Sequence, residues 1–154
     1  MTTDYEMLCQ QIASLAETDA SFVPLLANAS ALLWEAIADI NWAGFYLVRG
    51  DKLVLGPFQG KAACIHIAKG RGVCGTAWQQ NAVQRIPNVH EFPGHIACDG
   101  ASNAEIVIPL RKDGAVFGVL DIDSPVFHRF SARDQEGLER FARILETVID
   151  LEEE

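Results

Sequence analysis

The chain has 154 residues, of which 49 % are hydrophobic and 21 % are charged. This balance is typical of a folded domain and excludes a disordered tail, a collagen-like chain and a coiled coil. With 12 basic against 21 acidic residues the formal net charge is −9, which argues against nucleic-acid binding because such a surface repels phosphate.

The first part of the chain is predicted to be helical. Residues 4–18 carry apolar side chains at helical spacing, and Cys9 lies on their stripe, where a small buried thiol is expected. A second helix is predicted over residues 24–39, with Ser21 as its cap. The N-terminal helices therefore occupy about residues 4–39.

After the second helix the apolar residues change from helical spacing to alternation, which predicts strands. A short helix is expected over residues 76–80 and a long loop over residues 88–103, and loops of that length are usually functional or disordered. The sheet and loops occupy about residues 42–123. The predicted strands are residues 42–49, 52–58, 64–67, 83–86, 104–110 and 115–123.

A capping-box pattern at Ser131 and Asp134 begins the last predicted helix, about residues 132–151. The order of elements predicts an α+β fold, a single domain over residues 1–154. We expect a central antiparallel sheet with the terminal helices on one face. The loops on the other face then cover a ligand pocket.

Three carboxylates are predicted to meet on the loop side of the sheet. Alternation places Asp121 and Asp123 on one face of the last strand, and Ile122 with Val116 on the other. Glu105 points away from the apolar row of its own strand. Crowded carboxylates raise one another's pKa, so one of them can hold a proton near neutral pH. The alternative is three solvated acids at strand ends.

Trp42 and Tyr46 lie four residues apart on the first predicted strand and therefore share a face. They are able to form an aromatic wall against a small apolar group of a ligand. The alternative is that both rings simply pack in the core.

The cysteines are too few for a disulfide scaffold. No apolar run reaches the roughly 20 residues that span a bilayer, and the N-terminal residues have no signal-peptide pattern. We therefore expect a cytoplasmic protein without membrane association.

Cys64, Cys74 and Cys98 lie in irregular, glycine-bearing stretches, which favours redox chemistry. Cys74 precedes a predicted helix, a position that favours a thiolate.

A zinc-bound structural domain is the competing interpretation of these cysteines. Zinc sites in small domains usually contain a close Cys-x-x-Cys pair, which this sequence lacks. We therefore expect no metal. The candidate ligands for such a site would be Cys64, Cys74, Cys98, His66, His90 and His95.

Several segments together resemble the free methionine-(R)-sulfoxide reductases, which are GAF-domain enzymes. The resemblance extends from about Leu32 to Leu145. Residues 118–124 alone indicate only a GAF domain. The three cysteines at their spacing, together with Trp42 and Glu105, make the resemblance to this enzyme family much more specific. The segments that carry the resemblance are residues 41–46, 69–75, 104–110 and 118–124, with the loop around Cys98.

The resemblance implies a GAF fold whose pocket is closed by the cysteine-bearing loops. It implies free methionine-(R)-sulfoxide as substrate, thioredoxin as external reductant, no further cofactor and often a homodimer. The implied catalytic residues are Cys98 as nucleophile, Cys64 as resolving cysteine, Cys74 as a further participant, and Glu105 and Asp123. The implied substrate-binding residues are Trp42, Tyr46, Glu105, Asp121 and Asp123.

The expected chemistry agrees with this resemblance. A thiolate attacks the sulfoxide sulfur while a carboxylic acid supplies a proton, and a sulfenic acid remains on the cysteine. A second thiol then condenses with it to a disulfide, which an external dithiol reduces. The alternative is a GAF domain that binds a small molecule as a sensor without chemistry.

Overall fold

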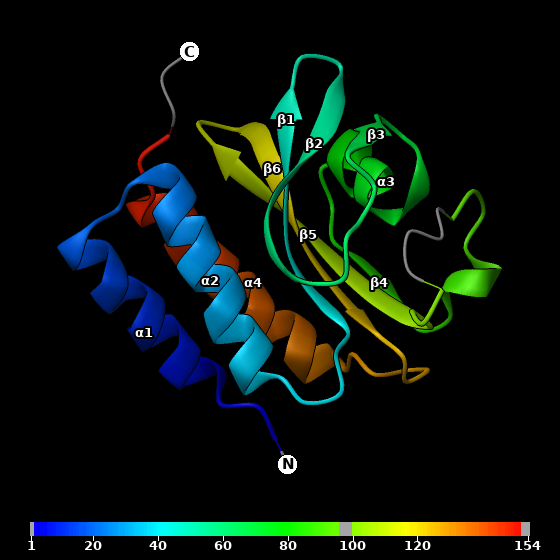
Figure 1. The fold of residues 1–154 in the computed structure, drawn as a ribbon, viewed down its shortest axis with the longest axis horizontal. Coiled ribbons are helices and arrows are strands. Elements are labelled where there is room, and N and C mark those ends of the chain that lie inside the picture. The colour runs from blue at the N-terminus through cyan, green and yellow to red at the C-terminus, as the bar shows by residue number, and fades with distance from the viewer. Residues whose placement is uncertain (1, 96–99, 152–154) are drawn as a thin grey trace.

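The computed structural model of the chain describes residues 2–95 and 100–151. Within these ranges three long helices enclose one side of a six-stranded sheet, and a shorter helix lies on the other side (Figure 1). The elements are α1 (Tyr5–Thr18), α2 (Phe22–Ala36), β1 (Trp42–Arg49), β2 (Lys52–Gly60), β3 (His66–Ala68), α3 (Gly72–Gln80), β4 (Gln84–Ile86), a 3₁₀ turn η1 (Val89–Glu91), β5 (Ala104–Lys112), β6 (Ala115–Ser124) and α4 (Ala132–Val148).

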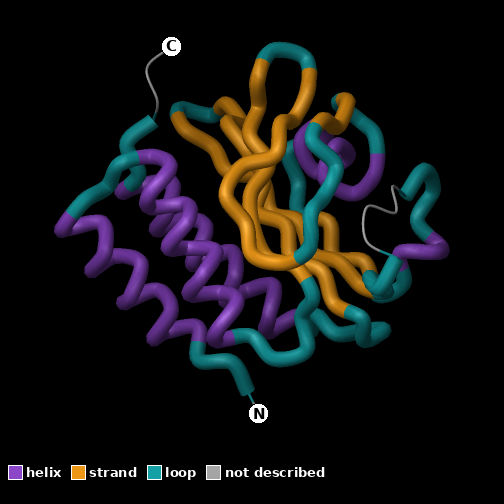
Figure 2. Tube along the Cα trace, viewed as in Figure 1, coloured by secondary structure: helices purple, strands orange, loops and turns teal. Residues whose placement is uncertain are grey.

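The strands follow the order β3-β2-β1-β6-β5-β4, and all neighbouring pairs are antiparallel. Helix α2 packs on β1 and β2, α4 packs on β5, and α1 lies against both helices (Figure 2). Helix α3 contacts β5 and β6 from the opposite face. The predicted α+β fold, with the terminal helices on one face of an antiparallel sheet, is confirmed.

Alternation along the central strands separates two hydrophobic cores. On β1, Phe45 and Leu47 belong to the core under the long helices, whereas Trp42 and Tyr46 belong to a smaller core under α3. Successive side chains of a strand point to opposite faces of the sheet, which produces this division. The shared face predicted for Trp42 and Tyr46 is therefore confirmed.

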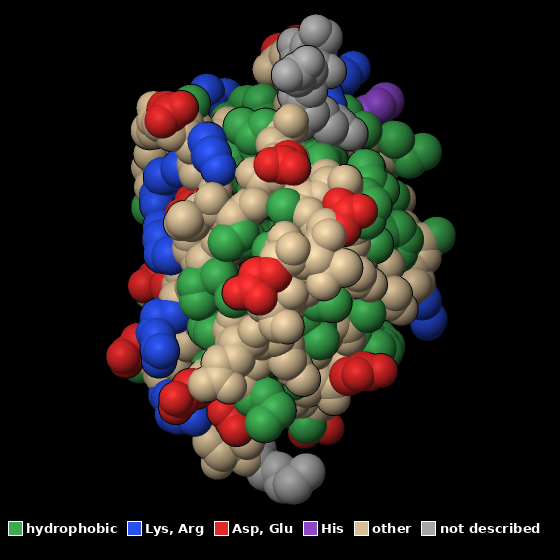
Figure 3. All heavy atoms as spheres, turned by 90° about the vertical axis from the view of Figure 1, so that its left-hand side faces the viewer, with side chains coloured by type: hydrophobic (Ala, Val, Ile, Leu, Met, Phe, Trp, Pro, Cys, Tyr) green, Lys and Arg blue, Asp and Glu red, His purple; other side chains and the backbone are tan. Residues whose placement is uncertain are grey.

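The surface over the long helices mixes acidic, basic and hydrophobic side chains (Figure 3). Its exposed apolar side chains include Met7, Val23 and Trp34. None of the helices in the described ranges combines the length and the apolar content that a bilayer span requires.

Val116 lies on the face opposite to the one predicted. In the register of β5 and β6, Leu110 pairs with Gly118 and Arg111 pairs with Val116, so Phe117 is an extra residue. Such a bulge shifts the alternation by one residue. Phe117 therefore packs against the core under the long helices, and Val116 packs against the core under α3.

Helix α3 and strand β3 also differ from the sequence-based expectation. The helix begins at Gly72, four residues before the predicted start at Thr76, so Cys74 lies inside it. Strand β3 begins at His66, which leaves Cys64 in the preceding loop rather than in a strand. The first turn of α3 was not predicted to be helical because it contains Gly72 and Gly75, and glycine is a poor helix former.

Gly137 provides the contact between α4 and α1. A Cβ atom at this position would overlap the ring of Tyr5, whose hydroxyl donates a hydrogen bond to Asp134 at 2.6 Å. We expect Gly137→Ala to destabilise the fold by about 2 kcal/mol, because overpacking outweighs the gain in helix propensity.

The measurement is a thermal melt beside Glu136→Ala, a substitution at an exposed position of the same helix. The melting temperature of Gly137→Ala should fall by about 4–8 °C. A melting temperature at or above that of the unmodified chain would show that the Tyr5 ring can move aside without cost.

Candidate active site

The three central strands bring the predicted acids together on the face that carries α3. Glu105 of β5 pairs directly with Asp123 of β6, and Asp123 pairs with Trp42 of β1. Asp121 lies two residues from Asp123 and therefore on the same face. All four side chains line one pocket, so their predicted meeting point is confirmed.

Burial sets the protonation of the acids. Glu105 and Asp121 are 7 % and 5 % exposed. Burial, followed by the charges of Asp121 and Asp123, raises the pKa of Glu105 well above its usual value. Burial also raises the pKa of Asp121, although hydrogen bonds from Glu105, Asp123 and Cys74 lower it in part. Of these two acids, Glu105 is the one whose pKa burial and neighbouring charge raise further.

One carboxylate oxygen of Asp121 is available to a ligand. Asp121 Oδ1 is buried, and the described part of the chain offers it no hydrogen-bond donor. An unsatisfied buried carboxylate oxygen is costly, and a cationic donor in the pocket would relieve that cost.

The aromatic wall consists of stacked rings. Trp42 stacks with both Tyr46 and Phe58, and its ring centroid lies 5.8 Å from that of Tyr46 and 5.0 Å from that of Phe58. Trp42 Nε1 donates a hydrogen bond to the carbonyl of Lys61 at 3.1 Å, and the Tyr46 hydroxyl donates to the carbonyl of Cys64 at 2.8 Å. The rings are thus fixed both by stacking and by hydrogen bonds.

The N-terminus of α3 closes another side of the pocket. Gly72, Val73 and Cys74 line it, together with Arg71 at the N-cap position. Gly72 has a φ of 62°, a left-handed conformation that favours glycine. Among the described residues, no side-chain cap hydrogen bond is made at this end of the helix, and the first amide groups of a helix favour an anion.

Cys74 does not have the environment predicted for it. Its side chain is buried at the start of α3, with Sγ 3.9 Å from Glu105 Oε2. Burial, followed by the charges of Asp121 and Glu105, raises the pKa of its thiol well above the usual value. Desolvation and neighbouring acids outweigh the helix dipole, and the expectation of a thiolate at Cys74 is wrong.

The remaining cysteines differ in their surroundings. Cys64 takes part in a disulfide, whereas Cys9 and Cys74 carry free thiols. Cys9 is buried among the long helices, as predicted. Cys98 lies outside the described residues, and its role as nucleophile stays a prediction.

The histidines bear on the zinc interpretation. His66 is exposed on β3, and His90 Nε2 is hydrogen-bonded to Asn103 Oδ1 at 2.8 Å. In the described ranges, three potential ligand atoms lie within 4.8 Å of one another, one each from Cys74, Glu105 and Asp121. This group is not the cysteine–histidine set considered from the sequence.

Several residues of the pocket were not predicted to bind substrate, although His95 was a candidate zinc ligand and Arg71 lies in the segment 69–75 that carries the resemblance. His95 Nε2 lies 3.9 Å from Glu105 Oε1, and burial, followed by His90, lowers the pKa of its imidazole. Arg71 stands between two glycines, a pattern that marks close backbone approach and could have indicated a site. The further lining residues are Ala62, Ala63, Ile67, Gly72, Val73 and Ser102.

Comparison with known proteins gives consistent matches along the chain. The GAF domain model matches residues 25–150. Free methionine-R-sulfoxide reductase of Escherichia coli is 56 % identical over 148 residues, which cover 96 % of this chain and 90 % of that protein.

Solved structures extend the match to three dimensions. The reduced form of fRMsr of Staphylococcus aureus has a TM-score of 0.93 at 48 % identity and covers 97 % of both chains. The free methionine-R-sulfoxide reductase of Neisseria meningitidis, in complex with its substrate, has a TM-score of 0.90 at 42 % identity, covering 96 % of this chain and 91 % of that one. The chain therefore belongs to the GAF domain family and, within it, to the free methionine-R-sulfoxide reductases.

Proposed function

We propose that this protein reduces free methionine-(R)-sulfoxide to methionine. The observation that carries the proposal is a group of three acids, the buried Glu105 and Asp121 with the half-buried Asp123, beside an aromatic wall and the N-terminus of α3. Such a pocket offers acids for an ammonium, amides for a carboxylate and a ring for a methyl group. A free amino acid presents these three groups at once.

The pocket geometry supports one orientation of the substrate. Its ammonium lies against Asp121, whose buried Oδ1 lacks a donor in the described chain. Its carboxylate lies at the first turn of α3, near Arg71. Its S-methyl group lies on Trp42, which directs the sulfoxide oxygen toward Glu105.

In the proposed reaction Glu105 is the proton donor, because its pKa is raised well above the usual value. The thiolate of Cys98 attacks the sulfoxide sulfur, and the oxygen passes to the cysteine as the sulfur–oxygen bond of the substrate breaks. Methionine leaves, and Cys98 becomes a sulfenic acid. The sulfur of the substrate is reduced and that of Cys98 is oxidised.

A second cysteine completes the proposed cycle. Cys64 attacks the sulfenic acid, and the resulting disulfide is reduced by thioredoxin through thiol–disulfide exchange. A cycle that depends on an external dithiol belongs in the reducing cytoplasm. We propose no bound cofactor or metal, and we expect a homodimer, as the family resemblance implies.

Cys64→Ser separates the two halves of this cycle. We expect the variant to release about one methionine per chain and then to stop, because only the nucleophile is needed for the first turnover. The measurement compares single-turnover methionine release with steady-state turnover supported by thioredoxin.

The matched variant is Cys74→Ser, which tests the second candidate for the resolving role. If Cys64→Ser cycles normally and Cys74→Ser does not, the resolving role belongs to Cys74. If the unmodified chain binds the sulfoxide but releases no methionine, the chain acts as a sensor rather than as a reductase.

A further inference from the structure

A thiol and two carboxyl groups from three different elements meet in the pocket. Cys74 comes from α3, Glu105 from β5 and Asp121 from β6, and one ligand atom of each lies within 4.8 Å of the other two. Cys74 Sγ lies 3.9 Å from Glu105 Oε2, and sulfur and oxygen ligands of one zinc ion are separated by roughly 3.5 Å. The three side chains therefore need only a small approach to hold one ion.

A buried oxygen of this group points to a cationic ligand. Asp121 is 5 % exposed and lines the pocket, and the described part of the chain offers its Oδ1 no hydrogen-bond donor. Among the described residues, no lysine or arginine forms an ion pair with Asp121 or Glu105. When these two carboxyl groups are ionised, a divalent cation would supply the balancing charge that no basic side chain provides.

The ligand atoms select the kind of cation. Ca²⁺ and Mg²⁺ take oxygen ligands, whereas a thiolate beside two carboxylates suits Zn²⁺ and other thiophilic ions. Burial, followed by the charges of Asp121 and Glu105, raises the pKa of the Cys74 thiol and opposes its ionisation. A divalent cation reverses this effect, because its charge stabilises the thiolate and both carboxylates together.

We propose that the pocket binds a thiophilic divalent cation such as Zn²⁺ through Cys74, Glu105 and Asp121, and that the ion excludes the substrate. The exclusion rests on the proposed function, in which the substrate ammonium lies against Asp121. The ion arrives from solution as an inhibitor and takes no part in the proposed reaction. On binding it displaces the thiol proton of Cys74, which passes to the solvent.

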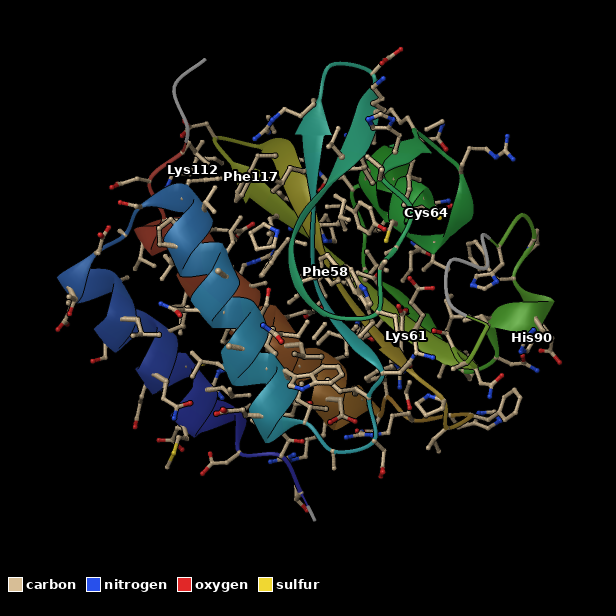
Figure 4. The ribbon with its side chains drawn as sticks, viewed as in Figure 1. Phe58, Lys61, Cys64, His90, Lys112 and Phe117 are labelled. Atoms are coloured by element: carbon tan, nitrogen blue, oxygen red, sulfur yellow. The ribbon has the colours of Figure 1, made fainter. Side chains whose placement is uncertain are left out.

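The other described cysteines do not compete for the ion. Cys64 lies in the loop before β3 (Figure 4) and takes part in a disulfide, so it offers no thiolate while that bond is intact. Cys9 carries a free thiol, but it lies in the core under the long helices, on the opposite face of the sheet. The disulfide form of the chain is therefore the form in which to measure the binding of an ion at Cys74.

The experiment titrates this disulfide form with Cd²⁺, a thiophilic substitute for Zn²⁺ whose bond to a thiolate gives an ultraviolet charge-transfer band. We expect the band to saturate at about one Cd²⁺ per chain and to be lost in Cys74→Ser. Loss of a group that only supports a metal ligand typically weakens binding by about 10–100-fold. Asp121→Asn and Glu105→Gln, which alter ligands themselves, should each weaken Cd²⁺ binding by at least about tenfold.

The controls are Cys9→Ser and Asp51→Asn. The first removes a buried thiol outside the pocket, and the second removes one negative charge from the exposed turn between β1 and β2. Both should bind Cd²⁺ as the unmodified chain does. The cation site would be overturned by the absence of a band in the unmodified chain, by a band that persists in Cys74→Ser, or by equal weakening in Asp51→Asn.

Competition tests the exclusion of the substrate. Free methionine-(R)-sulfoxide at about ten times its own Kd should raise the apparent Kd of Cd²⁺ about tenfold, because the two ligands bind the same form of the chain at the same carboxylate. Cd²⁺ binding that the sulfoxide leaves unchanged would overturn the exclusion. A reduced, ion-free chain that releases no methionine would instead refute the proposed function and leave the cation site standing.

Discussion

Cys98→Ser is expected to lower the reduction of free methionine-(R)-sulfoxide by at least about 10³-fold, because a serine hydroxyl is a far weaker nucleophile than a thiolate. No second thiol in the described pocket can substitute. Burial, followed by the charges of Asp121 and Glu105, raises the pKa of the Cys74 thiol and so opposes its ionisation. The loss should therefore appear in the first turnover as well as in the steady state.

The measurement is single-turnover methionine release by Cys98→Ser beside Cys9→Ser. Cys9 is a buried free thiol among the long helices, so its replacement should affect stability but not turnover. Release close to that of the unmodified chain in Cys98→Ser would show that another residue is the nucleophile.

Blocking the amino group of the substrate is expected to lower kcat/KM by at least about a hundredfold. An ammonium against the buried carboxylate of Asp121 makes a charge-assisted hydrogen bond, typically worth about 1.5–3 kcal/mol. An N-acylated substrate loses this bond and leaves the buried acid unpaired, which costs more. Since 1.4 kcal/mol corresponds to a factor of about ten, the two effects together exceed a hundredfold.

The comparison uses free methionine-(R)-sulfoxide and its N-acetyl amide on the same preparation. As a matched variant, Asp121→Asn should lose most of the preference, because it loses activity mainly on the free amino acid. Equal kcat/KM for the two substrates in the unmodified chain would mean that the acids do not recognise the ammonium.

Much of the site followed from alternation alone. Asp121, Asp123 and Glu105 lie on regular parts of β5 and β6, where the side-chain period of two holds and the cross-strand register brings them together. Val116 lies beyond the bulge at Phe117, where the period shifts by one residue, and no local pattern marks that shift.

The environment of Cys74 could not be predicted from its local sequence. A glycine turn before a helix favours a thiolate, but the acids that oppose it come from β5 and β6, more than 30 residues along the chain. The hydrogen bond from Tyr46 to Cys64 is similar, since it joins a strand to a loop that has no periodic pattern. Long-range contacts of this kind depend on the complete fold.

The most direct test of the account is turnover of the two epimers of free methionine sulfoxide with thioredoxin as reductant. Trp42 of β1 and Glu105 of β5 line the same pocket from the two strands on either side of β6, so only one epimer can place its methyl group on the ring and its oxygen at the acid. The account predicts sustained release of methionine from the R epimer and none above background from the S epimer. Equal turnover of both epimers, or of neither, would contradict it.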